Sequence, residues 1–323
     1  MSLLMNLGLI VAGFALLVWS ADRFVAGSAA IARAFDVPTI IIGLTLVAIG
    51  SSAPELFVSA TASLKNSPGI AVGNALGSNI TNVGLVIGIC ALVRPLAVGS
   101  STLRREFPWL IVVTALAIIL MYDLYLSFTD GLILLFCFVL TIVGLVYLAK
   151  HLKGGDKIAE EIDAELPPPM PLKPAIFWTI VGLVVLPLSA NILVQGASAI
   201  ATSMGISDLV IGLTIVAIGT SLPELAASLA GVLKGEDDLA VGNVLGSNIF
   251  NLLGVLAFPG LLRPTALESD MLTRDLPVMA TLTILFFVFA FRLKGQGIIN
   301  RWEGSLLLAT FLGYTSWLVY TNI

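Results

Sequence analysis

The chain contains an internal duplication whose two copies carry polar residues inside apolar sequence. Residues 37–96 align with residues 206–265 at a constant offset of 169, without insertion or deletion, and 29 of the 60 positions are identical. Glu55 corresponds to Glu224, and Asn82 corresponds to Asn251. Because a carboxylate is costly in apolar surroundings, its presence in both copies predicts a site built from both halves of the chain.

The composition indicates an integral membrane protein. Apolar residues make up 58% of the chain and charged residues 11%, with a mean hydropathy of +1.04, whereas a soluble domain has about 25% charged residues. A helical span of the hydrocarbon core takes about 20 residues, and ten segments are long and apolar enough. These are residues 4–32, 38–64, 69–93, 105–122, 129–149, 174–202, 207–233, 239–262, 274–292 and 303–320. We therefore expect an all-α polytopic membrane protein with ten transmembrane helices.

The basic residues between these segments predict the orientation of the chain. Alternate loops on one side hold twelve lysines and arginines, and the loops on the other side hold three. The richer side is expected in the cytoplasm, which places both termini outside. Five spans per half is an odd number, so the halves, residues 1–149 and 174–323, are expected to be inverted repeats joined by a cytoplasmic linker, residues 150–173. Inverted repeats favour a transporter that works by alternating access.

Several classes of function are disfavoured by what the chain contains. Cys90 and Cys137 fall inside predicted spans, and the single histidine, His151, falls in a predicted loop. Neither a disulfide framework, a thiolate metal site nor Ser–His catalysis is expected. We predict that the protein is not an enzyme, has no cofactor besides transported ions, binds no nucleic acid and needs no protein partner, the lipid bilayer being its surroundings.

The second and seventh segments each contain a proline within a polar motif, GSSAPE (residues 50–55) and GTSLPE (residues 219–224). Pro54 and Pro223 cannot donate a backbone hydrogen bond, so each motif is expected to break its helix and expose carbonyl groups. The neighbouring hydroxyl groups belong to Ser51, Ser52, Thr220 and Ser221. Hydroxyl, carbonyl and carboxylate oxygens suit Ca²⁺ or Na⁺. The alternative is a simple kink with hydroxyl groups that bond back to the helix.

The third and eighth segments carry polar stripes with a helical spacing of four residues. The stripes consist of Asn74, Ser78 and Asn82 in one copy and Asn243, Ser247 and Asn251 in the other. Such stripes either join helices by hydrogen bonds or face ions. We expect Asn74, Asn79, Asn243 and Asn248 to be mainly structural and Asn82 and Asn251 to face the ions. Arg23, in the first segment, could neutralise at most one of the two glutamates.

At IGLTLVAIGSSAPEL with GNALGSNITN, and again at IGLTIVAIGTSLPEL with GNVLGSNIFN, the chain resembles the sodium/calcium exchanger superfamily. It is most similar to compact bacterial and archaeal antiporters. The resemblance implies ten helices in two inverted five-helix repeats, with helices 2, 3, 7 and 8 broken. Segments one and six would be gating helices that slide against an eight-helix core.

The resemblance also implies roles for individual residues. Glu55 and Glu224 would be carboxylates shared by Ca²⁺ and Na⁺, and Asn82 and Asn251 would line the middle of the site. The remaining ligands would be hydroxyl groups or carbonyls of Ser51 and Thr220, the adjoining Ser52 and Ser221, backbone carbonyls of Ala48 and Ala217, and flanking sodium ligands Ser78 and Ser247. Some family members have Asp at the position of Asn251, so this chain has one carboxylate fewer.

Two carboxylates can be neutralised by one Ca²⁺, by several Na⁺ or by protons, and these ions compete. We therefore expect exchange of Na⁺ for Ca²⁺ across a bacterial-type inner membrane, with Ca²⁺ expelled. The alternatives are Ca²⁺/H⁺ exchange, K⁺-dependent exchange on the same scaffold, or a passive cation channel.

Overall fold

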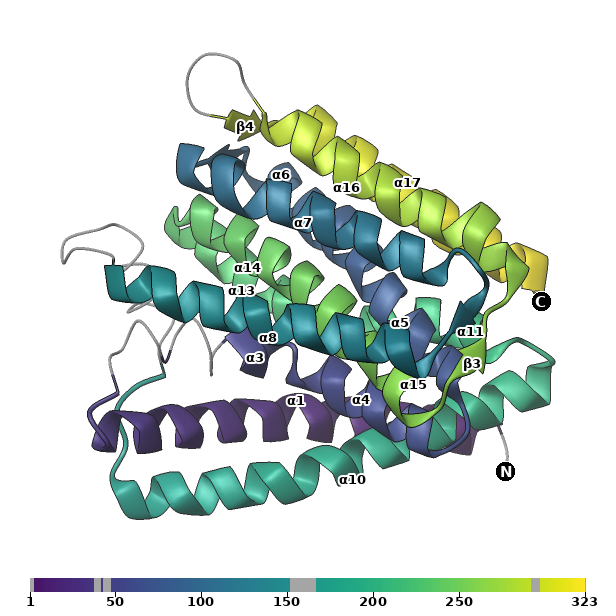
Figure 1. Cartoon of the computed structure of the whole chain (residues 1–323), viewed down its shortest axis with the longest axis horizontal. Helices are drawn as coiled ribbons and strands as arrows, with labels where there is room; N and C mark the ends of the chain where they lie inside the picture. Colours follow the sequence, from purple (N-terminus) through teal and green to yellow (C-terminus); the bar gives the residue numbers. More distant parts are fainter. Residues whose placement is uncertain (1–2, 38–41, 43–47, 152–166, 292–296, 323) are drawn as a thin grey trace.

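Long apolar sequences fold into long helices here, as expected for a chain that must satisfy its backbone hydrogen bonds inside a membrane. The structure, a computed structural model, describes residues 3–37, 42, 48–151, 167–291 and 297–322, and most of these are helical (Figure 1). Six helices are long and apolar enough to cross a membrane, or seven if one bent pair counts as a span. The described chain therefore has the helices of a membrane protein.

The described helices fall into two groups along the chain, one in each half. The first half contains α1 (Leu3–Ala34), α3 (Ala48–Ser51), α4 (Ala53–Leu64), α5 (Pro68–Thr81), the π-helix η2 (Asn82–Ile87), α6 (Gly88–Val93), α7 (Ser100–Met121) and α8 (Phe128–His151). The second half contains α10 (Leu172–Met204), α11 (Asp208–Ile211), the π-helix η3 (Gly212–Val216), α12 (Ala217–Thr220), α13 (Leu222–Lys234), α14 (Asp237–Phe250), the π-helix η4 (Asn251–Val255), α15 (Ala257–Leu262), the π-helix η5 (Met271–Asp275), α16 (Leu276–Ala290) and α17 (Arg301–Asn322).

Helices α1 and α10 pack against each other as an antiparallel pair at one side of the molecule (Figure 1). Glycines bring their backbones close together: a Cβ at Gly13 would lie 2.8 Å from the Cβ of Leu193, and a Cβ at Gly27 would lie 2.6 Å from the carbonyl oxygen of Ala175. Residue numbers rise along α1 as they fall along α10, so the two helices run in opposite directions. These contacts suit two helices with small residues at their interface.

The centre of the molecule is formed by contacts between the two halves. Helix α5 packs against α11, η3 and α12, and α14 packs against α3. Helix α4 contacts η4 and α15, while α13 contacts η2 and α6. The interrupted helix of each half therefore lies against the helix of the other half that carries an asparagine stripe.

Two short antiparallel ribbons also join the halves, which an all-α prediction did not include. Strand β1 (Leu96–Val98) pairs with β4 (Gly297–Ile299), and β2 (Tyr125–Leu126) pairs with β3 (Thr265–Ala266). The strands lie in connections just beyond the helix ends, where the backbone groups need partners outside a helix. The fold is mostly helical, with each ribbon linking one half of the chain to the other.

The predicted breaks are present in only two of the four helices. A one-residue interruption at Ser52 separates α3 from α4, and one at Ser221 separates α12 from α13. The predicted break in the third segment is wrong, because residues 68–93 form one uninterrupted helical span. In the eighth segment, a one-residue turn at Leu256 separates η4 from α15, although residues 237–262 still form a single span. There the helix changes to a π-helix at Asn82 and at Asn251. A π-helical turn can absorb a local change in hydrogen bonding without ending the helix, and such turns are frequent at functional sites.

The predicted linker, residues 150–173, falls largely on residues 152–166, which lie outside the described part of the chain. Its near end differs from the prediction, because His151 ends α8 and is not in a loop. At its far end, Arg33 Nη1 donates a hydrogen bond of 2.7 Å to the carbonyl oxygen of Pro167. This contact ties the end of α1 to the segment that leads into α10.

Candidate cation-binding site

The two interrupted helices place similar groups at their breaks. Pro54 and Pro223 occupy the first turns of α4 and α13, where a missing backbone N–H costs little. The helical segments on either side of Ser221 are bent by 40°. Ser52 and Ser221 stand at the N-cap positions, but their buried hydroxyl groups form no hydrogen bond with the described residues. Both hydroxyl groups are therefore available to a ligand.

Glu55 and Glu224 lie in the first turns of α4 and α13 and are buried, with 0% and 1% of their surfaces exposed. Both oxygens of Glu55 and Oε2 of Glu224 form no hydrogen bond with described residues. The ion pairs in the described chain involve Arg94 and Arg274, and neither glutamate takes part. A buried charge without a partner costs several kcal/mol, so these groups need a cation or protons.

The two glutamates are also close enough to repel each other electrostatically. Each carboxylate stands at the N-terminus of a helix, where the helix dipole partly offsets its negative charge. The hydroxyl group of Ser247 donates a hydrogen bond of 3.4 Å to Glu224 Oε1. The helix dipoles and the hydroxyl group of Ser247 do not neutralise two carboxylates. A cation shared by Glu55 and Glu224 would reduce both the cost of burying the charges and the repulsion between them.

Thr220 connects the break of the second half to the first half. Its hydroxyl lies beside Glu55 but donates to Asn74 Oδ1, at 3.1 Å, and it lies 3.4 Å from the hydroxyl of Ser78. Asn74 in turn donates from Nδ2 to the backbone carbonyl of Glu55, at 3.3 Å. The expectation that Asn74 has a structural role therefore fits its contacts, and Thr220 and Ser78 lie next to the carboxylate.

The asparagines at the π-helices have unequal surroundings. Asn82 Nδ2 donates to Asn248 Oδ1 at 3.0 Å, which leaves Asn82 Oδ1 without a hydrogen bond to the described residues. Neither amide atom of Asn251 has such a partner. The corresponding acceptor, Asn79 Oδ1, also has no hydrogen-bond partner among the described residues, while Asn79 Nδ2 donates to the carbonyl of Ala75 at 3.0 Å. Asn82 and Asn251 thus keep free oxygen atoms in the buried centre.

The other predicted ligands differ in their availability. The carbonyl of Ala217 accepts a hydrogen bond from the backbone N–H of Ser221, at 3.1 Å, and lies 3.3 Å from Thr220 Oγ1, whose one proton it shares with Asn74 Oδ1. Ser51 ends α3 and is partly buried. Ala48 begins α3, directly after residues 43–47, which lie outside the described ranges. A cation at the Ala217 carbonyl would have to replace one of its hydrogen bonds.

Two features of the site were not predicted. Ser59, one turn after Glu55, donates from its hydroxyl to the carbonyl of Val255 at 2.9 Å and so ties α4 to η4. The corresponding residue, Ser228, accepts a hydrogen bond of 3.1 Å from Asn243. The sequence feature that could have predicted both contacts is a serine four residues after each glutamate, on the same face of the helix. Arg23, which could have neutralised one glutamate, instead forms a cation–π contact, with its Cζ 5.0 Å from the ring centre of Trp178, and pairs with neither glutamate in the described chain.

Comparison with known proteins identifies the family. The model of the family described as "Sodium/calcium exchanger protein" matches residues 5–147 and 174–320. CaxA of Alkalimonas amylolytica is 52% identical over 305 residues, which cover 94% of this chain and 96% of the relative. Inner membrane protein YrbG of Escherichia coli (strain K12) is 42% identical over 322 residues, with 99% and 98% covered.

A solved structure has the same overall arrangement. The sodium-calcium exchanger NCX_Mj, soaked with Na⁺ and Sr²⁺, superposes with a TM-score of 0.65 and 34% sequence identity, covering 98% of this chain and 99% of that chain. The matches extend over both halves and both asparagine-bearing helices, and they confirm the resemblance seen in the two motifs. The chain is a membrane protein that belongs to the sodium/calcium exchanger protein family.

Proposed function

We propose that this protein is a secondary antiporter that exchanges Na⁺ for Ca²⁺ by alternating access. The observation that carries the proposal is the pair Glu55 and Glu224, which is buried and has no basic partner among the described residues. Hydroxyl and amide oxygens from both halves surround the pair. These are hard ligands, which suit Na⁺ and Ca²⁺.

The charge of the site explains how two ions could be coupled. Two carboxylates carry a charge of −2, which one Ca²⁺ balances and which two or more Na⁺ could also balance. An empty site would leave both charges buried and uncompensated, at a cost of several kcal/mol for each. If that cost prevents the empty protein from changing conformation, only loaded states alternate and the ions are exchanged. A flexible set of oxygen ligands would favour Ca²⁺ over Mg²⁺, which requires a near-ideal octahedron.

We also propose that the architecture is two inverted five-helix repeats, residues 1–149 and 174–323, with ten transmembrane helices in all. Support comes from the antiparallel α1–α10 pair and from the corresponding contacts that α4 and α13 make with the other half. The excess of basic residues in alternate loops supports termini outside the cell. An inner-membrane location and outward Ca²⁺ transport are part of the same proposal, and the relative YrbG, an inner membrane protein, supports the location.

Uptake of ⁴⁵Ca²⁺ into everted membrane vesicles tests the function. We expect uptake to depend on an imposed Na⁺ gradient and to persist without K⁺ and without a pH gradient. Uptake driven by a proton gradient and indifferent to Na⁺ would identify Ca²⁺/H⁺ exchange instead. A requirement for K⁺ would identify the K⁺-dependent reaction, and Ca²⁺ flux without any counter-ion would identify a channel.

Replacement of the glutamates tests the site. Glu55→Gln and Glu224→Gln are each expected to abolish Na⁺-dependent Ca²⁺ uptake, because each removes half of the charge that holds Ca²⁺. Asp22→Asn is the matched control, since Asp22 is an acid within α1 that is exposed and lies outside the pair. Membrane insertion is checked by immunoblotting of washed membranes. Normal transport by both glutamine variants would refute the assigned site.

A further inference from the structure

One face of α10 changes from apolar to polar at Pro187. From the N-terminal part of the helix to the residue that follows the proline, the face presents Phe177, Ile180, Val184 and Leu188, each more than half exposed. At the same helical spacing, the face continues on the other side with Asn191, Gln195, Ser198 and Thr202, which are partly or fully exposed. Hydrocarbon suits the first set, but polar side chains are costly in hydrocarbon and usually face protein or water.

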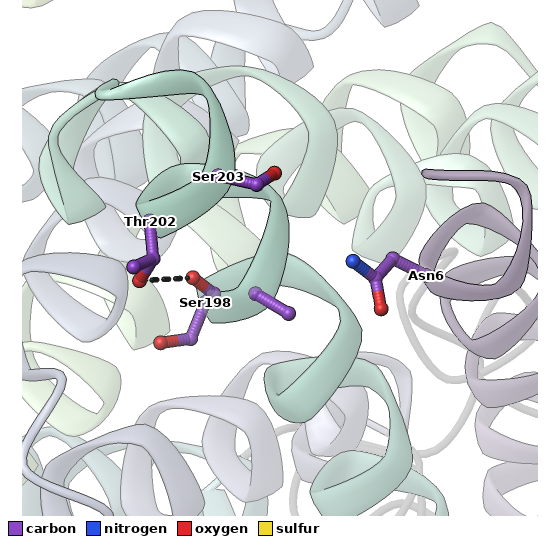
Figure 2. A pocket seen from close by; sticks show the side chains of 5 residues that line it. Asn6, Ser198, Thr202 and Ser203 are labelled. Atoms are coloured by element: carbon purple, nitrogen blue, oxygen red, sulfur yellow. Dashed lines mark hydrogen bonds between the residues drawn. The ribbon is translucent and has the colours of Figure 1, made fainter. Parts of the chain in front are cut away.

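A pocket lies at the far end of this polar face. It has a volume of about 450 Å³ and is lined by Asn6, Ser198, Ala199, Thr202 and Ser203. Figure 2 shows Asn6 of α1 on one side of the pocket and the three hydroxyl-bearing residues of α10 on the other. The pocket therefore joins the two helices that form the antiparallel pair.

Asn6 gives the pocket a group that needs a ligand. Its side chain belongs to a residue that is only 2% exposed, and its Oδ1 accepts no hydrogen bond from the described part of the chain. A buried acceptor left in this state costs about 1–3 kcal/mol. A cation or a water molecule held by a cation would satisfy it.

The polar face lies against the core of the protein at Ser198. The hydroxyl of Ser198 lies 3.4 Å from that of Ser67, which precedes α5. Helix α10 also packs along α4, whose first turn carries Glu55. The polar face is about 16 Å long at 1.5 Å per residue, and α4 extends about 14 Å from Glu55 to its last residue, Leu64, at the same rise. The helix that carries the polar face thus runs beside the helix that carries Glu55, and Ser198 marks where the polar face meets the core.

The lining of the pocket indicates which cation it would take. Its polar groups are one amide and three hydroxyl groups, and no carboxylate is among the lining residues. Protein sites for Ca²⁺ usually contain several carboxylates. The volume is large enough for an ion with its water shell, since a water molecule occupies about 30 Å³. Neutral oxygens with room for water favour weak binding of a hydrated monovalent cation.

We propose that this pocket is a second, peripheral cation site, which binds hydrated Na⁺ and delivers it along the polar face of α10 toward Glu55 and Glu224. The delivery step rests on the proposed exchange function, whereas Na⁺ binding in the pocket does not. The face is hydrated from Thr202 inward to Asn191, and it stops being hydrated at Leu188, next to Pro187.

Cysteine labelling of the full-length protein in nanodiscs tests the hydrated face. The background variant is Cys137→Ala, with the buried Cys90 retained. Gln195→Cys is compared with Val184→Cys, which lies on the same face beyond Pro187. A charged methanethiosulfonate reagent is expected to modify Gln195→Cys at least about tenfold faster, because the reaction requires a thiolate in water. Equal, slow modification of both would overturn the hydrated face.

The pocket itself is tested with Ala199→Cys, which leaves all the proposed oxygen ligands in place. We expect Na⁺ to slow its modification relative to choline at equal ionic strength, and Ca²⁺ to slow it less. Asn6→Ala should remove this protection, and the pair Ser198→Ala and Thr202→Val should weaken it if Asn6→Ala does not fold. Absence of protection, or equal protection by Na⁺ and Ca²⁺, would overturn the site.

Transport separates the peripheral site from the exchange function. Ser198→Ala combined with Thr202→Val is expected to raise the Na⁺ concentration for half-maximal ⁴⁵Ca²⁺ transport several-fold while leaving the Ca²⁺ concentration for half-maximal transport unchanged. An unchanged Na⁺ dependence would overturn the delivery step. A wild-type protein without Na⁺-dependent Ca²⁺ transport would refute the proposed function, and the labelling of Ala199→Cys would still decide whether the pocket binds Na⁺.

Discussion

A side chain at Gly219 is predicted to impair exchange by separating α1 from the break between α12 and α13. Gly219 lies under the ring of Phe14, a residue of α1, and a Cβ built at Gly219 would overlap that ring. An extra methyl group in a filled site costs about 1–3 kcal/mol. The ring of Phe14 cannot stay where it is, so either the ring or α1 itself must move.

The size of the loss in exchange depends on which of the two conformations the added methyl group destabilises. If α1 slides against the core, as the family resemblance implies, it leaves this contact when the protein changes conformation, so the cost applies to the described arrangement and not to the alternative one. A bias of 1–3 kcal/mol corresponds to a change of about 5- to 150-fold in the equilibrium between the two. Exchange requires the protein to pass through both arrangements in turn. If the return to the described arrangement is the slowest step, the turnover rate is expected to fall by the same factor of about 5 to 150.

The assay is the initial rate of Na⁺-driven ⁴⁵Ca²⁺ uptake, normalised to the amount of inserted protein. Gly246→Ala is the matched control, because it adds the same methyl group in the other motif, where no atom lies within 4 Å. Phe14→Leu should relieve the defect of Gly219→Ala, with a coupling of about 1 kcal/mol or more in a double-mutant cycle. A Gly219→Ala variant that behaves like Gly246→Ala, or a defect that Phe14→Leu leaves unchanged, would refute the reasoning.

Three further substitutions test other parts of the structure by thermal unfolding in detergent, followed by tryptophan fluorescence. Tyr314→Phe removes a hydrogen bond of 2.7 Å to the buried carboxylate of Asp275 and should lower the free energy of unfolding by about 2 kcal/mol; no loss would show that the bond contributes nothing. Burial raises the pKa of Glu268, so the folded protein favours the protonated form, and stability should fall as the pH rises from about 4.3 through the raised pKa. Glu268→Gln should flatten that decline, and an unchanged slope would contradict the assignment. Ser59→Ala should cost about 1 kcal/mol, because it removes the bond between α4 and η4, whereas Thr310→Val, whose hydroxyl bonds within its own helix, should cost less.

The helices were predictable because membrane spans follow from length and apolarity. The α-helices α1, α8 and α10 begin and end within a few residues of the predicted segments. The breaks at Ser52 and Ser221 were also predictable, since a proline follows each by two residues and cannot donate its backbone hydrogen bond. The π-helices that begin at Asn82 and Asn251 were not predictable. An asparagine does not determine whether a backbone N–H bonds to the carbonyl four or five residues earlier in the chain.

The content of the candidate site was predictable to a similar degree. Paired glutamates in apolar sequence pointed to a shared buried site, and the structure buries both of them. The partner of Asn82 was not predictable, because its contact with Asn248 depends on how α5 and α14 cross. The same holds for Arg23, whose cation–π partner Trp178 lies on α10 and is set by the packing of the outer helix pair.

The unequal hydrogen bonds of the two halves have a physical consequence for exchange. Asn82 donates to Asn248 Oδ1, but Asn251 makes no corresponding bond to Asn79 Oδ1, and both Asn251 Nδ2 and Asn79 Oδ1 are without partners in the described chain. All four residues are asparagines, so the difference arises from the relative positions of the helices and not from side-chain chemistry. If alternating access exchanges the positions of the two halves, Asn251 gains the partner that Asn82 loses, and the number of hydrogen bonds is unchanged. The two arrangements then differ little in free energy, as is needed for a small difference in ion binding to shift the equilibrium between them.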